Sequence, residues 1–148
     1  MKHQLTLALL LVTSIVLAQT QIKDFNLKKQ VALDGYDPVS YFDNKPEEGK
    51  AEIKATHNGA IYYFINQQNV SKFKANPSKY EPAYGGWCAY AMGDSGKKVE
   101  VDPETFKIVD NKLYLFYNKF FNNTLTSWNK DETNLKNNAD KNWQRILK

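Results

Sequence analysis

The chain has 148 residues, of which 42% are hydrophobic, 14% aromatic and 24% charged, a composition that fits one ordinary domain with a packed core. Its 20 Lys and Arg residues against 16 Asp and Glu residues leave a net charge of +4, which is spread along the sequence and argues against a nucleic-acid-binding protein. One Cys and two His exclude a disulfide framework, a zinc knuckle and any cluster of several thiolates or imidazoles.

The first 18 residues are typical of a secretory signal peptide. A basic start is followed by a mostly apolar run from Leu5 to Val16, and the side chains of Val16 and Ala18 suit cleavage before Gln19. The run is short for a membrane span, which needs about 20 residues, and a retained N-terminal anchor is the alternative. We therefore expect an exported protein, periplasmic or extracellular, with no membrane span after cleavage. His57 would then be the single histidine of the mature chain.

Two β-hairpins are predicted within one domain. Residues 19–30 are expected to form a polar lead-in, and residues 31–148 the domain itself. Two stretches of strand-forming residues each contain a turn pair, Asn58-Gly59 in the first and Asp110-Asn111 in the second. Asn-Gly between strands is the strongest short-range signal for a hairpin, because both central residues of its turn need positive φ.

A helical pattern follows each predicted hairpin. After the first hairpin, a helix-compatible stretch around Phe73 can be capped by Asn66 and must end at Pro77. After the second hairpin, three apolar residues recur at i, i+4 and i+7, namely Phe121, Leu125 and Trp128. The hairpins superpose at an offset of 52 residues and the helices at an offset of 55. We therefore interpret the chain as an internal duplication of a strand-strand-helix unit, with three extra residues in the second copy.

The C-terminal stretch predicts one further helix. Its apolar residues form a single stripe with spacings of four, four and three, and its other faces carry charges of both signs. The stripe consists of Leu135, Ala139, Trp143 and Ile146. We expect it to pack on the sheet. The predicted fold class is therefore α+β, with a small antiparallel sheet from two hairpin-plus-helix units that is closed by a C-terminal helix.

The segment from Tyr84 to Gly93, between the two units, carries the main candidates for chemistry. If residues 87–92 are helical, Cys88 and Met92 lie at i and i+4 on one face, and both sulfur atoms can point at one bound ion or ligand. Such sulfur ligands suit a soft metal ion such as Cu(I), and His57 completes the set if its hairpin turn reaches this helix. A nucleophile and base pair of Cys88 and His57 is a second interpretation, and a buried structural cysteine is a third.

The same segment also predicts a pocket for a small ligand. Two adjacent glycines allow positive φ or a close approach of the backbone, and the aromatic side chains beside them can line a cavity for a flat or sugar-like molecule. The candidate ligand-binding residues are Tyr84, Gly85, Gly86, Trp87 and Tyr90, with Tyr36 as a further aromatic side chain. The alternative is an ordinary aromatic core. A separate pair, Asp34 and Asp37, is interpreted either as cation-binding or acid-base carboxylates or as turn residues.

An ordered set of residues in this chain resembles the YHS domain family of small secreted proteins. The likeness covers residues 31–146, and its most specific part is Tyr84-Gly85-Gly86-Trp87-Cys88-Ala89-Tyr90. It also includes Gly35-Tyr36-Asp37-Pro38-Val39, Asn76-Pro77, Lys79-Tyr80, Asp110-Asn111-Lys112-Leu113-Tyr114-Leu115 and Asn142-Trp143. The resemblance implies a compact α+β domain of the cell envelope and no particular activity. Related cysteine-rich domains are associated with metals through several Cys, where this chain has one.

Two functions stay open at this point. The first is an exported binding module that holds a soft metal ion or a small ligand near Cys88, without catalysis. The second is a structural or protein-interaction domain of the cell envelope with no small-molecule site. Convergence of Cys88, Met92 and His57 would support metal binding, and an open pocket at the glycine pair with Cys88 at its base would support a small ligand.

Overall fold

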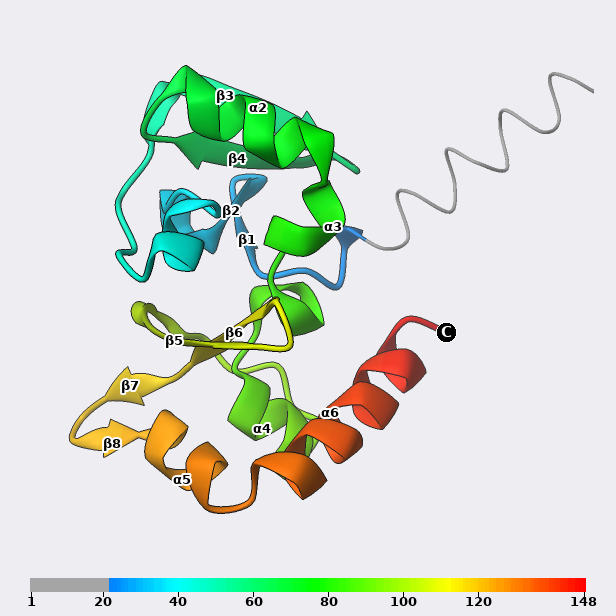
Figure 1. Cartoon of the computed structure of the whole chain (residues 1–148). Helices are drawn as coiled ribbons and strands as arrows, with labels where there is room; N and C mark the ends of the chain where they lie inside the picture. Colours follow the sequence, from blue (N-terminus) through cyan, green and yellow to red (C-terminus); the bar gives the residue numbers. More distant parts are fainter. Residues whose placement is uncertain (1–21) are drawn as a thin grey trace, which may run out of the picture.

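Two hairpin-and-helix units, drawn one above the other in Figure 1, form the computed structural model, which describes residues 22–148. The upper unit contains β3, β4 and α2, and the lower unit contains β5, β6 and α5 (Figure 1). A long helix, α6, closes the chain at the C-terminus. The predicted α+β class is therefore confirmed. The predicted signal peptide, residues 1–18, lies outside the described residues.

The first unit follows the predicted order of strand, turn, strand and helix. It consists of β3 (Lys50–His57), β4 (Ala60–Phe64), α2 (Gln67–Ala75) and the short helix α3 (Pro77–Tyr80). The hairpin turn is Asn58-Gly59, with φ values of 49° and 85°, the pair of positive angles that a tight turn requires. Asn66 caps α2 by accepting a hydrogen bond from the Asn69 N–H at 2.8 Å, and α2 ends before Pro77, as expected.

The second unit repeats this geometry at the predicted offset. It consists of β5 (Asp102–Val109), β6 (Lys112–Phe116) and α5 (Thr124–Lys130). Both of its strands begin and end 52 residues after β3 and β4, and α5 ends 55 residues after α2. Its turn, Asp110-Asn111, has φ values of 49° and 61°. The ladder shifts register near the start of both hairpins, so the two units are equivalent in detail.

The two hairpins belong to separate sheets. β3 and β4 share a four-stranded sheet with β1 (Leu27–Lys28) and β2 (Val31–Ala32), in the order β1-β2-β4-β3. β2 is parallel to β4, and the other pairs in this sheet are antiparallel. β5 and β6 form a two-stranded sheet of their own. Residues 22–30, the described part of the predicted lead-in, thus contribute a strand to the domain.

The segment between β6 and α5 departs from the prediction. The sequence pattern placed Phe121 on the same helix as Trp128, but Asn118–Lys119 and Asn122–Asn123 form the short strands β7 and β8. Phe121 lies in the turn between them with φ of 62°, and the helix begins only at Thr124. A spacing of four and three fits a helix, but it contains no information about φ at Phe121. The predicted helix therefore began too early.

The predicted C-terminal helix is present as α6 (Glu132–Ile146), but its stripe packs mainly on another helix. α4 (Ala89–Asp94) lies against it (Figure 1). The approach is so close that a Cβ atom at Gly93 would overlap the carbonyl oxygen of Leu135. The expected direct packing of the stripe on the sheet is corrected accordingly. In residues 22–148, no helix has the length and apolar character needed to cross a membrane.

Buried side chains form two clusters on the two faces of β6. Side chains alternate along a strand, so one face takes Leu113 and Leu115 and the other takes Tyr114 and Phe116. The first cluster also includes Tyr41, Phe64, Phe73 and Cys88. The second cluster also includes Met92, Trp128 and Ala139. β6 therefore lies between the two buried clusters.

A buried carboxylate joins three parts of the first unit. Asp37 is fully buried, and its Oδ1 accepts a hydrogen bond from the Val39 N–H at 2.8 Å. Its Oδ2 accepts hydrogen bonds from the Ile65 N–H at 2.9 Å and from the Asn69 side-chain amide at 2.7 Å. These bonds hold the end of β4 and the first turn of α2 against the turn that follows Asp37. The turn interpretation of Asp37 therefore fits its surroundings.

Replacing this carboxylate by an amide is expected to destabilise the fold. Asp37→Asn should lower the free energy of unfolding by about 2–4 kcal/mol, because the new NH2 group faces N–H donors and one acceptor is lost. Asp34→Asn is the matched control, since Asp34 forms an ion pair with the exposed Lys28 at 2.7 Å and should cost about 1 kcal/mol or less. Urea unfolding followed by tryptophan fluorescence measures both. Equal losses would contradict the anchoring role.

Candidate functional site

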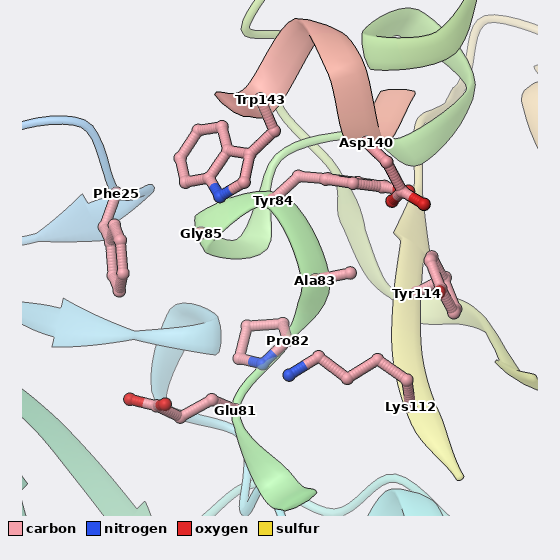
Figure 2. Close-up of a pocket in the computed structure, with 10 residues that line it drawn as sticks. All are labelled: Phe25, Glu81, Pro82, Ala83, Tyr84, Gly85, Lys112, Tyr114, Asp140 and Trp143. Carbon is pink, nitrogen blue, oxygen red and sulfur yellow. The ribbon is translucent and has the colours of Figure 1, made fainter. Parts of the chain in front are cut away.

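An open pocket of 290 Å³ lies where the second unit meets the N-terminal segment. The turn before α4, strand β6 and helix α6 surround it (Figure 2). Its lining residues are Phe25, Glu81, Pro82, Ala83, Tyr84, Gly85, Lys112, Tyr114, Asp140 and Trp143. Aromatic walls with a few polar groups are typical of small-molecule sites. An open pocket is therefore present beside Gly85, but Cys88 does not lie at its base.

The turn Ala83–Gly86 shapes one wall of the pocket. Tyr84, Gly85 and Gly86 have φ values of 54°, 59° and 87°, the positive angles that glycine adopts at little cost. A Cβ atom at Gly85 would lie 2.9 Å from ring atoms of both Phe25 and Trp143. The absence of a side chain at Gly85 thus lets these two rings reach the turn, and Figure 2 shows both beside it.

Tyr84 is held in place by α6. Its hydroxyl donates a hydrogen bond to Oδ1 of Asp140 at 2.8 Å, and burial together with this bond raises the pKa of Tyr84. Its ring packs against Tyr114, with ring centroids 5.8 Å apart. Burial raises the pKa of Tyr114 to about 12. Both phenols are therefore neutral near pH 7 and act as hydrogen-bonding groups.

Lys112 places an amine in the pocket. Its side chain extends from the start of β6 toward Glu81 (Figure 2), and Nζ donates a hydrogen bond to the carbonyl oxygen of Ser78 at 3.1 Å. Burial lowers the pKa of Lys112 below its ordinary value of 10.5, and the charge of Glu81 opposes part of this shift. Glu81 also lies 3.8 Å from Nε2 of His57. The pocket therefore contains a partly desolvated cation between carboxylates.

Cys88 is enclosed in the core of the second unit. Its side chain is fully buried, and Sγ accepts a hydrogen bond from the Tyr117 N–H at 3.3 Å. Sγ also lies 3.4 Å from Oγ1 of Thr124. Because the Thr124 hydroxyl donates to the Tyr117 carbonyl oxygen at 2.9 Å, the thiol is the donor to Thr124. The thiol therefore both accepts and donates a hydrogen bond within the protein.

The first unit places Asp37 where the second unit places Cys88. Both follow a turn of three positive φ angles, 59°, 53° and 87° in residues 33–35 and 54°, 59° and 87° in residues 84–86. The partners of Cys88 lie 52 and 55 residues after the Ile65 and Asn69 partners of Asp37. These are the offsets that relate the hairpins and the helices. The equivalence favours a structural role for Cys88 over a nucleophilic one.

The three predicted metal ligands have different neighbours. Cys88 belongs to one buried cluster and Met92 to the other. His57 lies 3.1 Å from the side-chain amide of Asn58 and points toward Glu81. Residues 22–148 contain no group of three His, Cys, Asp or Glu side chains that is placed to hold a metal ion. The geometry thus lends no support to a site of Cys88, Met92 and His57, and Cu(I) binding stays a prediction from the sequence.

The five predicted ligand-binding residues are divided between three places. Tyr84 and Gly85 line the pocket described above. Tyr90 lines a second open pocket, of 280 Å³, which lies over Cys88. Gly86 and Trp87 instead bind the N-terminal segment. The Gly86 carbonyl oxygen accepts a hydrogen bond from the Asn26 side chain, and the Trp87 indole donates one to the Asp24 carbonyl oxygen. Gly85 therefore lines the first of these pockets, but most of the pocket walls come from other elements.

Those other walls were missed by sequence reasoning. They are Phe25, Lys112, Tyr114, Asp140 and Trp143, together with Glu81. Part of the signal was available, because Lys112 and Tyr114 lie two apart on a strand and share a face, and Asp140 and Trp143 lie three apart on a helix. The position of Phe25 had no such signal, since only tertiary packing brings it to Gly85.

Comparisons of this chain with protein-family models, with curated proteins and with solved structures find no match. The resemblance to the YHS domain family therefore stays a prediction from the residues quoted above.

The titration of Lys112 tests the described environment of the pocket. The pKa of Lys112 is lower in the folded protein than its ordinary value of 10.5. Between these two pKa values the unfolded chain binds more protons than the folded protein, so the free energy of unfolding rises with pH. Below this window the full cost of the buried charge is present. We expect an NMR signal of a lysine Cε that titrates below 10.5 and is absent in Lys112→Met, together with a smaller alkaline rise in stability in that variant. Titration at or above 10.5 would contradict the burial of Lys112.

The structural role predicted for Cys88 implies a protected thiol. Labelling by an aromatic disulfide reagent should be at least ~100-fold slower in the native protein than in guanidinium chloride, because reaction must wait for the core to open. The absorbance of the released thiolate follows both rates. Rapid labelling under native conditions would instead indicate an exposed, reactive thiol and would revive the nucleophile interpretation.

Proposed function

We propose that this protein is an exported binding module that holds a small sugar-like ligand in the pocket between β6, α6 and the Ala83–Gly86 turn, without converting it. The observation that carries the proposal is the combination of aromatic rings with a cation and two carboxylates around a 290 Å³ pocket. Export follows from the expected signal peptide, and the resemblance to small secreted proteins agrees with it.

The polar groups of the pocket suit hydroxyl groups of a ligand. A sugar hydroxyl both donates and accepts hydrogen bonds, and the pocket offers acceptors in Glu81 and Asp140 and a donor in Lys112. The rings of Phe25 and Trp143 offer apolar faces on which the carbon skeleton of a ring can stack. The volume lies near the lower end of that of ligand pockets, which favours one or two sugar rings.

The geometry favours binding over catalysis. Burial and the hydrogen bond to Asp140 keep the Tyr84 hydroxyl neutral and engaged. Asp140 and Glu81 each accept a hydrogen bond from a tyrosine, Tyr84 and Tyr62 respectively. Both carboxylates of the pocket are therefore engaged in hydrogen bonds with the protein itself.

A titration with simple sugars tests this proposal. Glucose, N-acetylglucosamine, maltose and chitobiose are added to the full chain, and binding is followed by tryptophan fluorescence and by saturation-transfer NMR. At least one sugar should bind saturably. Lys112→Met should weaken it by about tenfold or more, because a hydrogen bond to a charged group is lost. Gly85→Ala should do the same, because the new Cβ would displace the rings of Phe25 and Trp143.

The matched control is Lys72→Met, which makes the same change at an exposed position of α2. Its affinity should equal that of the wild type. Failure of all four sugars to bind, or equal weakening by Lys72→Met and Lys112→Met, would contradict the proposal.

A further inference from the structure

The β7–β8 hairpin carries two exposed aromatic residues at its tip. Its strands pair Asn118 with Asn123 and Lys119 with Asn122, so Phe120 and Phe121 occupy the two central positions of the turn. Their exposed fractions are 88% and 110%, and no other large hydrophobic side chain in residues 22–148 is comparably exposed. In Figure 1 the hairpin projects from the lower left of the molecule, away from the core.

The backbone of this turn is unfavourable for phenylalanine. Phe120 and Phe121 have φ values of 53° and 62°, a region that bulky residues rarely adopt. Two of the other three hairpins have Asn58-Gly59 and Asp110-Asn111 at the same positions, the residue types that tolerate positive φ. The β1–β2 hairpin has Lys29-Gln30 there, with φ values of 50° and 68°. Exposed rings gain no packing in the folded protein that would offset this cost. Two large apolar side chains exposed at such a tip point to a function outside the fold.

The fold itself does not require this hairpin. In the first unit, only Ile65 and Asn66 separate β4 from α2. In the second unit, β7, β8 and their turn occupy the same place between β6 and α5. Because the first unit has no such hairpin, β7 and β8 are an addition to the strand-strand-helix arrangement that the two units share.

The charge around the tip identifies the chemistry of its partner. From Leu113 to Asn129 the only charged residue in the sequence is Lys119, which is exposed and adjacent to the two Phe. Aromatic side chains favour the boundary between lipid headgroups and acyl chains, and neighbouring cations favour anionic headgroups. A convex tip of this composition suits a lipid surface, whereas a protein groove would need a matched apolar cavity.

We propose that the Phe120-Phe121 tip inserts into the surface of an anionic membrane and docks the protein there peripherally. The two rings enter the headgroup boundary, and the Asn side chains that flank them, with Lys119, stay at headgroup level. This proposal is independent of the ligand pocket, whose residues do not include the tip.

The first experiment locates the tip in the bilayer. Two full-length proteins, wild type and Phe121→Trp, share the same native tryptophans. Each is mixed with vesicles of about 70% phosphatidylcholine and about 30% anionic phosphatidylglycerol. Bromine-labelled acyl chains in the vesicles should quench the added tryptophan and leave the native ones largely unchanged. The apolar segment from Leu5 to Val16 contributes equally to both chains. Equal quenching of the two proteins would overturn the proposal.

The second experiment separates docking from folding. Phe120→Asn/Phe121→Gly supplies the favoured turn residues, so its Tm should rise by several degrees, while its partition onto the same vesicles should fall by about tenfold or more. Asn111→Gly improves the turn of the β5–β6 hairpin in the same way and should leave the partition unchanged. Added salt should weaken wild-type binding. Undiminished vesicle binding by Phe120→Asn/Phe121→Gly would overturn membrane insertion and leave a protein partner as the occupant of the tip.

Discussion

Each unit of this protein depends on one buried acceptor that follows a left-handed turn. In the first unit a carboxylate, Asp37, receives three hydrogen bonds, enough to offset the cost of burying a charge. In the second unit a neutral thiol, Cys88, receives one backbone N–H and donates to a hydroxyl. Both acceptors fix the end of a hairpin to the start of the next helix, so the same frame tolerates either chemistry.

The candidate functional features belong to what the second unit adds to this frame. Asn76 ends α2 and begins a helix of one turn, whereas Asp131 ends α5 and begins the much longer α6. This longer helix supplies Asp140 and Trp143 to the pocket. The inserted β7–β8 hairpin supplies the aromatic tip. The first unit has neither addition and acts as a scaffold.

Local signals in the sequence were sufficient for the β3–β4 and β5–β6 hairpins and for α2. Asn58-Gly59 and Asp110-Asn111 require positive φ, and Asn66 and Pro77 bound a helix, so each conclusion needed only neighbouring residues. Resemblance between Asp34-Gly35-Tyr36-Asp37 and Gly85-Gly86-Trp87-Cys88 at an offset of 51 was also available and would have extended the duplication upstream.

What the sequence left open depends on contacts between distant segments. Nothing local shows that the stripe of α6 meets α4, that Phe25 reaches Gly85, or that His57 interacts with Glu81 near the pocket. The sequence directed attention to the turn whose residues Tyr84 and Gly85 line the pocket, because two glycines are unusual beside so many aromatic residues. Its walls come from four segments that only the folded chain brings together.

The N-terminal segment also sets the order in which the pocket is completed. Asn26 donates a backbone hydrogen bond to Gly85 at 2.8 Å, and the Trp87 indole donates to the carbonyl oxygen of Asp24 across a separation of 63 residues. Contacts so distant along the chain form after the local hairpins and helices. The first folded residues to leave the ribosome are therefore among the last to dock, and Phe25 closes the pocket only when both units have formed. A chain without this N-terminal segment would lack the Phe25 wall of the pocket.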